Sequence, residues 1–168
     1  VIEGDEKTGA RIIKRALVIQ HMEIDHTGRF LDFFAEDGII PEQVRLFAGQ
    51  DIPNLEPYDF LFVLGGAQDT WQEDDHPWLK AEKQAIREWV MDRAKPYFGV
   101  CLGHQLLATA LGGEVAPAEQ AEVGVFDVEL TEDGRRHPLI AGIGGRHKVM
   151  QWHAAEVKRP PQQAQVLA

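Results

Sequence analysis

The sequence predicts a doubly wound α/β fold built on a mostly parallel sheet. The run at 16–20 is apolar on both faces, as a buried parallel strand requires. Further strand-like apolar runs lie at 59–64 and 97–100. Segments with apolar residues at helical spacing lie between these runs. Strands that alternate with helices are typical of βαβ units, in which ligands bind at the carboxyl ends of the strands.

The elements are expected in a regular order along the chain. They are a strand at 16–20, a helix from Phe30 to Gly38, strands at 43–47 and 59–64, a helix at 78–94 and a strand before Cys101. Beyond residue 113 the pattern changes, with strands predicted at 123–130 and 148–152 and the start of another at 165–168. The loops after residues 64 and 100 are therefore expected at the same edge of the sheet.

The stretch at 97–111 changes from a strand-like to a helix-like pattern at Gly99-Val100-Cys101-Leu102-Gly103. A small residue on each side of a nucleophile is typical of a nucleophile elbow. Glycine permits both the strained turn and the close approach of backbones. Cys101 would then lie at a helix N-terminus, where partial positive charge favours the thiolate. The alternative is a buried core cysteine, the usual state of a lone cysteine.

Composition limits the possible partners. The chain has 168 residues, with 17 basic and 27 acidic side chains and a net charge of −10, which argues against nucleic acid or an anionic membrane as the main partner. Its one cysteine excludes an intrachain disulfide and is compatible with a reducing cytosol. The sequence shows neither an apolar run of about 20 residues nor the apolar core of a secretion signal, so we expect a cytoplasmic protein.

Residues 99–105, Gly-Val-Cys-Leu-Gly-His-Gln, resemble the nucleophile motif of class I glutamine amidotransferases. The Ile-Gln-His, His-Pro-Trp-Leu and Gln-Trp-His stretches are similar to stand-alone members related to the amidotransferase domain of GMP synthase. The resemblance implies a three-layer, flavodoxin-like domain at 16–168 after a lead-in at 1–15. Because a strand starts near Ala168, we expect the domain to be truncated at its C-terminus.

The resemblance implies that Cys101 attacks the side-chain amide of glutamine, forms a thioester and releases ammonia. Two backbone N–H groups would form the oxyanion hole. One belongs to Leu102, the residue after the nucleophile. The other is assigned to Gly66, because residues 65–67 resemble the Gly-Gly-Pro loop of the family. An ordinary tight turn is the alternative for this loop.

A second stretch, 151–157, resembles the family's His-Gly-Asp-Glu-Val loop, whose backbone holds the amino-acid end of glutamine. The resemblance implies substrate contacts for Gly65, Gln105, Trp152, His153, Ala154 and Ala155. Alanines replace the family's Gly and Asp at 154 and 155, which puts the affinity for glutamine in doubt. The alternative for His153 is a structural role.

The base of the family's triad lies in a His-Pro-Glu segment, and this sequence contains none. Two segments begin with the same His-Pro pair but precede the required place and lack the Glu: His76-Pro77-Trp78 and His137-Pro138-Leu139. The base is expected beyond Ala168, and His104 is an alternative. Without the base we expect these 168 residues to show only a trace of glutaminase activity, since general acid–base help is worth roughly 10²- to 10⁴-fold.

Two other functions remain open: a γ-glutamyl hydrolase or peptidase-like relative with the same elbow, and an inactive module that regulates a partner. Ammonia is expected to reach an acceptor on a synthetase subunit, because the Gly-Gly pairs at 112–113 and 144–145 lack the Lys-Ser/Thr of a phosphate loop. No cofactor is expected. The acidic run at 73–75 is interpreted as a solvated loop rather than a metal site.

Overall fold

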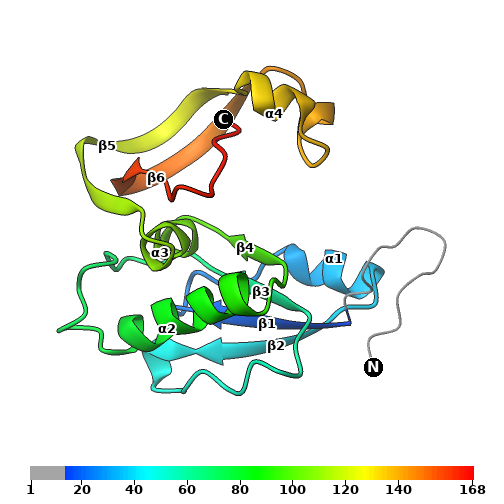
Figure 1. Cartoon of the computed structure of the whole chain (residues 1–168), viewed down its shortest axis with the longest axis vertical. Coiled ribbons are helices and arrows are strands. Elements are labelled where there is room, and N and C mark those ends of the chain that lie inside the picture. Colours follow the sequence, from blue (N-terminus) through cyan, green and yellow to red (C-terminus); the bar gives the residue numbers. More distant parts are fainter. Residues whose placement is uncertain (1–13) are drawn as a thin grey trace. The chain divides into compact units, whose positions relative to one another are not determined.

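The structure, a computed structural model, describes residues 14–168 (Figure 1). The predicted lead-in at 1–15 lies outside these residues except for Lys14 and Arg15, whose backbone N–H groups both donate to Asp59 Oδ2 at 3.1 Å. The chain divides into two compact units, residues 1–110 and 111–168.

The first unit alternates strands with helices, as predicted. Its elements are β1 (Arg15–Gln20), α1 (Phe30–Glu36), β2 (Ile40–Arg45), β3 (Phe60–Val63), α2 (Trp78–Arg87), β4 (Tyr97–Gly99) and α3 (Leu102–Ala110). A π turn, Glu88–Asp92, extends α2. The second strand, expected at 43–47, begins and ends earlier. Pro41 lacks an N–H but is tolerated because β2 lies at the edge of the sheet, and Leu46–Ala48 leave the strand as a 3-10 turn.

The four strands form a parallel sheet in the order β2-β1-β3-β4. This is the flavodoxin-like order, in which the chain adds strands on opposite sides of β1. In doubly wound sheets the ligand site lies outside the carboxyl ends of the strands where this order reverses. For this chain that position is at the ends of β1 and β3, so the topology points to the loops that follow Gln20 and Val63.

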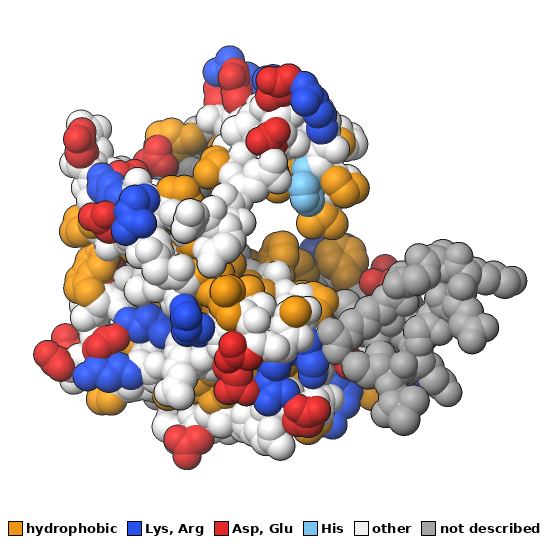
Figure 2. Space-filling view, in the orientation of Figure 1, with side chains coloured by type: hydrophobic (Ala, Val, Ile, Leu, Met, Phe, Trp, Pro, Cys, Tyr) orange, Lys and Arg blue, Asp and Glu red, His pale blue; other side chains and the backbone are white. Residues whose placement is uncertain are grey.

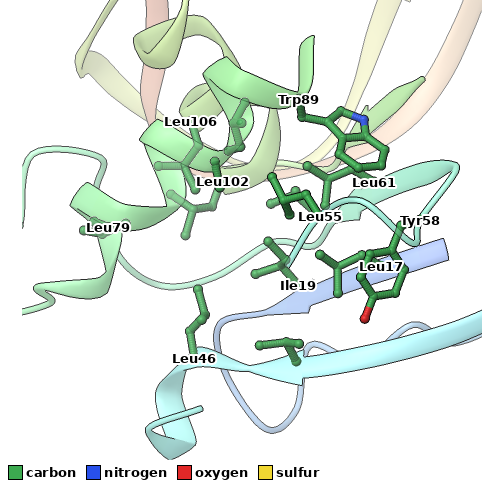
Figure 3. Packing of buried hydrophobic residues seen from close by; sticks show 14 residues of the cluster. Leu17, Ile19, Leu46, Leu55, Tyr58, Leu61, Leu79, Trp89, Leu102 and Leu106 are labelled. Atoms are coloured by element: carbon green, nitrogen blue, oxygen red, sulfur yellow. The ribbon is translucent and has the colours of Figure 1, made fainter. Parts of the chain in front are cut away.

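Helices cover both faces of the sheet, which gives the predicted three layers (Figure 1). Leu17 and Ile19 point to one face and pack with residues of α2 and α3, including Leu79, Leu102 and Leu106 (Figure 3). Alternate residues of the same strand, Ala16 and Val18, point to the other face and pack with Phe34 of α1. Because successive side chains of a strand alternate in direction, the doubly apolar pattern of β1 requires cover on both sides.

The second unit contains β5 (Glu114–Glu129), α4 (Glu132–Arg136), a 3-10 turn (Ala141–Ile143) and β6 (Arg146–Arg159). The two strands pair antiparallel and extend well beyond the predicted 123–130 and 148–152, because each satisfies the other's backbone groups. The strand predicted to start at 165–168 is absent from the structure. Instead the Thr131 N–H donates one hydrogen bond to the Leu167 carbonyl, at 3.0 Å.

The surface mixes charges of both signs. Figure 2 shows Lys and Arg side chains interspersed with Asp and Glu on the face that it displays. Among residues 14–168, no helix combines the length and the apolar character needed to cross a membrane.

Candidate active site

Cys101 lies at the turn between β4 and α3 and has a φ of +49°. This left-handed conformation costs a residue with a side chain about 1–2 kcal/mol. Backbone hydrogen bonds fix the turn on both sides: Val100 N–H donates to Val63 O at 2.9 Å, and Gln105 N–H donates to Cys101 O at 3.0 Å. The predicted strand–turn–helix geometry of a nucleophile elbow is present. Cys101 is exposed, so the alternative of a buried core cysteine is wrong.

Both glycines of the motif lie where a side chain has no room. A Cβ at Gly99 would approach the Gly103 carbonyl carbon to 2.6 Å, and a Cβ at Gly103 would collide with the Val63 carbonyl oxygen. The first turn of α3 therefore packs directly on the backbones of β3 and β4. This close approach sets the position of Cys101 at the sheet edge.

The loop Gly65-Gly66, directly after β3, lies against the elbow. A Cβ at Gly65 would lie 3.6 Å from the Cys101 Cβ, and a Cβ at Gly66 would lie 2.8 Å from Leu102 Cδ2. The loops that follow β3 and β4 thus meet at one edge, as their sequence positions predicted. A preorganised oxyanion hole needs N–H donors beside the nucleophile. The assignment of that role to the Gly66 and Leu102 N–H groups remains a prediction.

The electrostatic surroundings of Cys101 differ from expectation. Burial by neighbouring atoms raises the pKa of its thiol, a hydrogen bond from the Leu102 N–H lowers it, and the Asp25 carboxylate raises it, with a net increase. The helix N-terminus does act through Leu102, but desolvation and a nearby anion outweigh it. The Leu102 N–H thus acts in the expected direction, while the net pKa of the thiol is raised by the other two causes.

A buried histidine–carboxylate pair lies beneath the Gly65-Gly66 loop. His21 follows β1, Glu82 lies on α2, and both residues are 0% exposed. The His21 Nε2 lies 2.9 Å from Glu82 Oε1, and its Nδ1 lies 2.7 Å from the Gly65 carbonyl oxygen. Burial by itself lowers the pKa of His21, but the charge and hydrogen bond of Glu82, with smaller effects of Gly65 and Asp25, raise it overall.

Neither His21 nor Glu82 was predicted as a site residue from the sequence. One signal was available. Glu82 comes three residues after Leu79 and four before Ile86, so it lies on the helix face that these buried residues occupy. A carboxylate on a buried stripe needs a partner.

Two residues of α3, Gln105 and His104, follow Cys101 closely. Gln105 is buried, at 7% exposure, and its backbone N–H closes the first helical turn on Cys101. His104 is exposed, although partial desolvation lowers the pKa of its imidazole. A substrate contact for Gln105 and a role as base for His104 both remain predictions.

The other predicted substrate residues belong to the second unit. Trp152, His153, Ala154 and Ala155 lie within β6, so the expected loop is a strand. The strand is irregular there, because Glu122 pairs with His153 whereas Pro117 pairs with Ala155. His153 Nε2 lies 3.1 Å from Glu122 Oε2 and its Nδ1 lies 3.1 Å from the Ala155 carbonyl oxygen. These contacts agree with a structural role for His153, and the substrate role of all four remains a prediction.

The acidic run at 73–75 is tied to neighbouring lysines. Glu73 forms ion pairs with Lys83 at 2.5 Å and with Lys80 at 3.7 Å. Within residues 14–168, no group of three or more His, Cys, Asp or Glu is arranged to hold a metal ion.

A strained cysteine turn that faces a Gly-Gly loop at the carboxyl edge of a parallel sheet defines an α/β protein with a nucleophile elbow. The sequence profile of the family described as glutamine amidotransferase class-I matches residues 38–168. The chain belongs to the class I glutamine amidotransferase family, as the motif around Cys101 predicted.

Relatives of known name agree with this assignment. The chain is 34% identical over 143 residues to the glutamine amidotransferase-like protein YfeJ of Salmonella typhimurium, covering 83% of this chain and 59% of YfeJ. It is 32% identical over 124 residues to a glutamine-hydrolyzing GMP synthase subunit of Methanothermobacter thermautotrophicus, covering 70% of this chain and 60% of that relative. The chain thus spans about 60% of the length of these relatives.

Solved structures share the fold. A crystal structure of a glutamine amidotransferase from Thermotoga maritima superposes with a TM-score of 0.82 at 31% identity, covering 91% of this chain and 66% of that protein. The glutamine amidotransferase of Methylobacillus flagellatus has a TM-score of 0.79 at 28% identity, covering 89% of this chain and 59% of that protein. These likenesses confirm the predicted α/β class I amidotransferase fold.

Proposed function

We propose that this protein hydrolyses the side-chain amide of glutamine, or of a closely related γ-glutamyl compound, through Cys101. The observation that carries the proposal is the strained Cys101 turn, with φ of +49°, next to the Gly65-Gly66 loop. A left-handed cysteine is retained at a sheet edge only where the surrounding structure forces it, and such strain is concentrated at functional sites. Membership of the amidotransferase family gives the substrate class.

The chemistry would take place in two stages. The Cys101 sulfur attacks the amide carbon, a C–S bond forms, and the carbonyl oxygen becomes an oxyanion held by the N–H groups of Gly66 and Leu102. The C–N bond then breaks, and the nitrogen leaves as ammonia after taking up the proton that a base removed from the thiol. Water attacks the thioester, which releases glutamate and restores the thiol.

The ammonia acceptor is proposed to lie on a partner protein. The motivation is the relative that is named as one subunit of a GMP synthase, together with the lack of a phosphate-loop motif in this sequence. A cytoplasmic location, as expected from the composition, belongs to the same proposal.

The test is ammonia release with three substrates in parallel: free glutamine, a γ-glutamyl amide and a γ-glutamyl peptide. It uses a chain extended through the expected His-x-Glu segment, because residues 1–168 alone are expected to show only a trace of activity. Hydrolysis of glutamine that is lost in Cys101→Ser supports the proposal, because sulfur is the better nucleophile near neutral pH. Turnover restricted to γ-glutamyl peptides would instead identify a γ-glutamyl hydrolase. Binding of glutamine without turnover, even with an ammonia-accepting partner, would identify a regulatory module.

A further inference from the structure

The His21 ring is held on three sides beneath the Gly65-Gly66 loop. Its Nδ1 faces the Gly65 carbonyl oxygen at 2.7 Å and its Nε2 faces Glu82 Oε1 at 2.9 Å. The Trp78 ring stacks on its face, with centroids 5.4 Å apart and planes 15° from parallel. With the ring fully buried, both the position and the plane of the imidazole are determined by its surroundings.

The direction of one hydrogen bond follows from chemistry alone. A carbonyl oxygen only accepts hydrogen bonds, so Nδ1 must carry the proton that it donates to Gly65. The carboxylate of Glu82 on the opposite side can accept from Nε2 and keeps the ring in this orientation. Glu82 therefore acts on Gly65 through His21.

The bond to Gly65 also orients the next N–H group. The peptide bonds that the structure describes are all trans, so the N–H of Gly66 points opposite to the C=O of Gly65. Because that carbonyl is directed at the buried ring, the Gly66 N–H is directed away from it. The same loop meets Cys101, since a Cβ at Gly65 would lie 3.6 Å from the Cys101 Cβ.

We infer that His21 is a positioning residue that holds the Gly65–Gly66 peptide plane so that the Gly66 N–H can receive the oxyanion formed at Cys101. Glu82 orients His21 for this task. The inference rests on the proposed function, because it assigns the Gly66 N–H to the oxyanion hole. The inference adds that His21 and Glu82, two residues far apart in the sequence, hold the Gly66 N–H in place.

Stability alone is a poor explanation for the pair. Removing a carboxylate from water is costly, and buried ion pairs are often no more stabilising than apolar side chains of similar volume. Among the described residues, Glu82 Oε2 is buried and has no hydrogen-bond partner, so the pair carries an additional unsatisfied group. A role in orienting a reactive loop accounts for a polar pair at this position.

The test uses two variants that each keep one half of the histidine. In His21→Asn the amide nitrogen stands near the place of Nδ1 and can still donate to Gly65. In His21→Gln it stands near the place of Nε2, so the contact with Glu82 is kept and the donor to Gly65 is lost. If His21 served only to pair with Glu82, His21→Gln would stay closer to the wild type than His21→Asn.

The readout is a ratio of labelling rates at Cys101, the single cysteine of the chain, measured by mass spectrometry on the whole protein. A chloromethyl ketone analogue of glutamine forms an oxyanion when the thiolate adds to its carbonyl. Methyl methanethiosulfonate reacts at sulfur and forms none. We expect His21→Gln to lower the ketone-to-thiosulfonate ratio by about 10²-fold, the effect of losing one oxyanion donor, and His21→Asn to stay within about threefold of the wild type.

An unchanged ratio in His21→Gln, or an equal fall in both variants, would overturn the inference. If His21→Gln does not fold, the ¹⁵N NMR signal of His21 in the wild type tests the inference instead. An unprotonated Nδ1 contradicts the inference. A protonated Nδ1 whose signal shifts on labelling with the ketone supports it. Failure of the proposed function has a different signature. The wild type would then react no faster with the glutamine-shaped ketone than with chloroacetone. The chloroacetone-to-thiosulfonate ratio of labelling rates would still report on the role of His21.

Discussion

Asp25 and Cys101 approach Gly65 together. A Cβ at Gly65 would collide with the Asp25 carboxylate and would lie 3.6 Å from the Cys101 Cβ. The half-buried Asp25 carboxylate therefore stands beside Cys101, and its negative charge raises the pKa of the thiol. A raised pKa leaves less thiolate at neutral pH, so we expect Cys101 to need a base for attack.

The first prediction concerns this anion. Asp25→Asn should lower the pKa of Cys101 and raise its rate of labelling by methyl methanethiosulfonate at pH 7 by about threefold, because an amide no longer disfavours the thiolate. The pH dependence of labelling should show a midpoint at lower pH than in the wild type. The exposed Asp32→Asn on α1 is the matched control, and equal midpoints in all three proteins would contradict the prediction.

A second prediction tests the strain at the turn. Cys101→Gly should be about 0.5–1 kcal/mol more stable to urea than Cys101→Ala, because glycine adopts a φ of +49° without the steric cost that a Cβ imposes. Both variants lack the sulfur, so their difference isolates the backbone. Both should also lose ammonia release. Equal urea midpoints for Gly and Ala would show that the turn is not strained.

A third prediction concerns the packing of α3 on the sheet. Gly103→Ala should destabilise the protein by about 2 kcal/mol, because the new Cβ would overlap the Val63 carbonyl oxygen. Gly142→Ala is the matched control, since a Cβ there meets nothing within 4 Å, and it should cost less than about 0.5 kcal/mol. Chemical denaturation of both variants measures the difference, and similar losses would contradict the packing argument.

The fourth prediction is the pH dependence that the buried pair confers. The pKa of His21 is raised above 6.5 in the folded state, so its contribution to stability is complete below about pH 6.5 and is lost as pH rises through the raised value. The acids that act on His21 are Glu82 and Asp25. Glu82→Gln should destabilise the protein by about 3 kcal/mol at pH 6 and by less at pH 9.

Thermal unfolding at the two pH values checks this, with Glu36→Gln as an exposed-carboxylate control on α1. A loss of the same size at pH 6 and pH 9 would mean that the pair does not titrate in the folded protein.

Much of the first unit could be predicted from the sequence because its signals are local. Short apolar runs located β1, β3 and β4 closely, and the runs of β1 and β3 are buried in the sheet as their apolar pattern indicates. The Gly-x-Cys-x-Gly spacing located the elbow, because a turn with φ above zero beside packed backbones tolerates little but glycine at its flanks. The placement of the Gly65-Gly66 loop beside Cys101 followed from the rule that carboxyl ends of parallel strands share one edge.

The full length of β5 and β6 and the hydrogen bond of Thr131 with Leu167 were not predictable in this way. Hydrogen bonds between distant segments decide how far such a strand extends. By itself the sequence determined the family, the sheet and the position of the Cys101 turn. Only the tertiary structure decided that His21 and Glu82, 61 positions apart, are buried together beneath the Gly65 carbonyl, and that Asp25 opposes the helix N-terminus at Cys101. Burial and distance set the charge state of these groups, and neither is a property of local sequence.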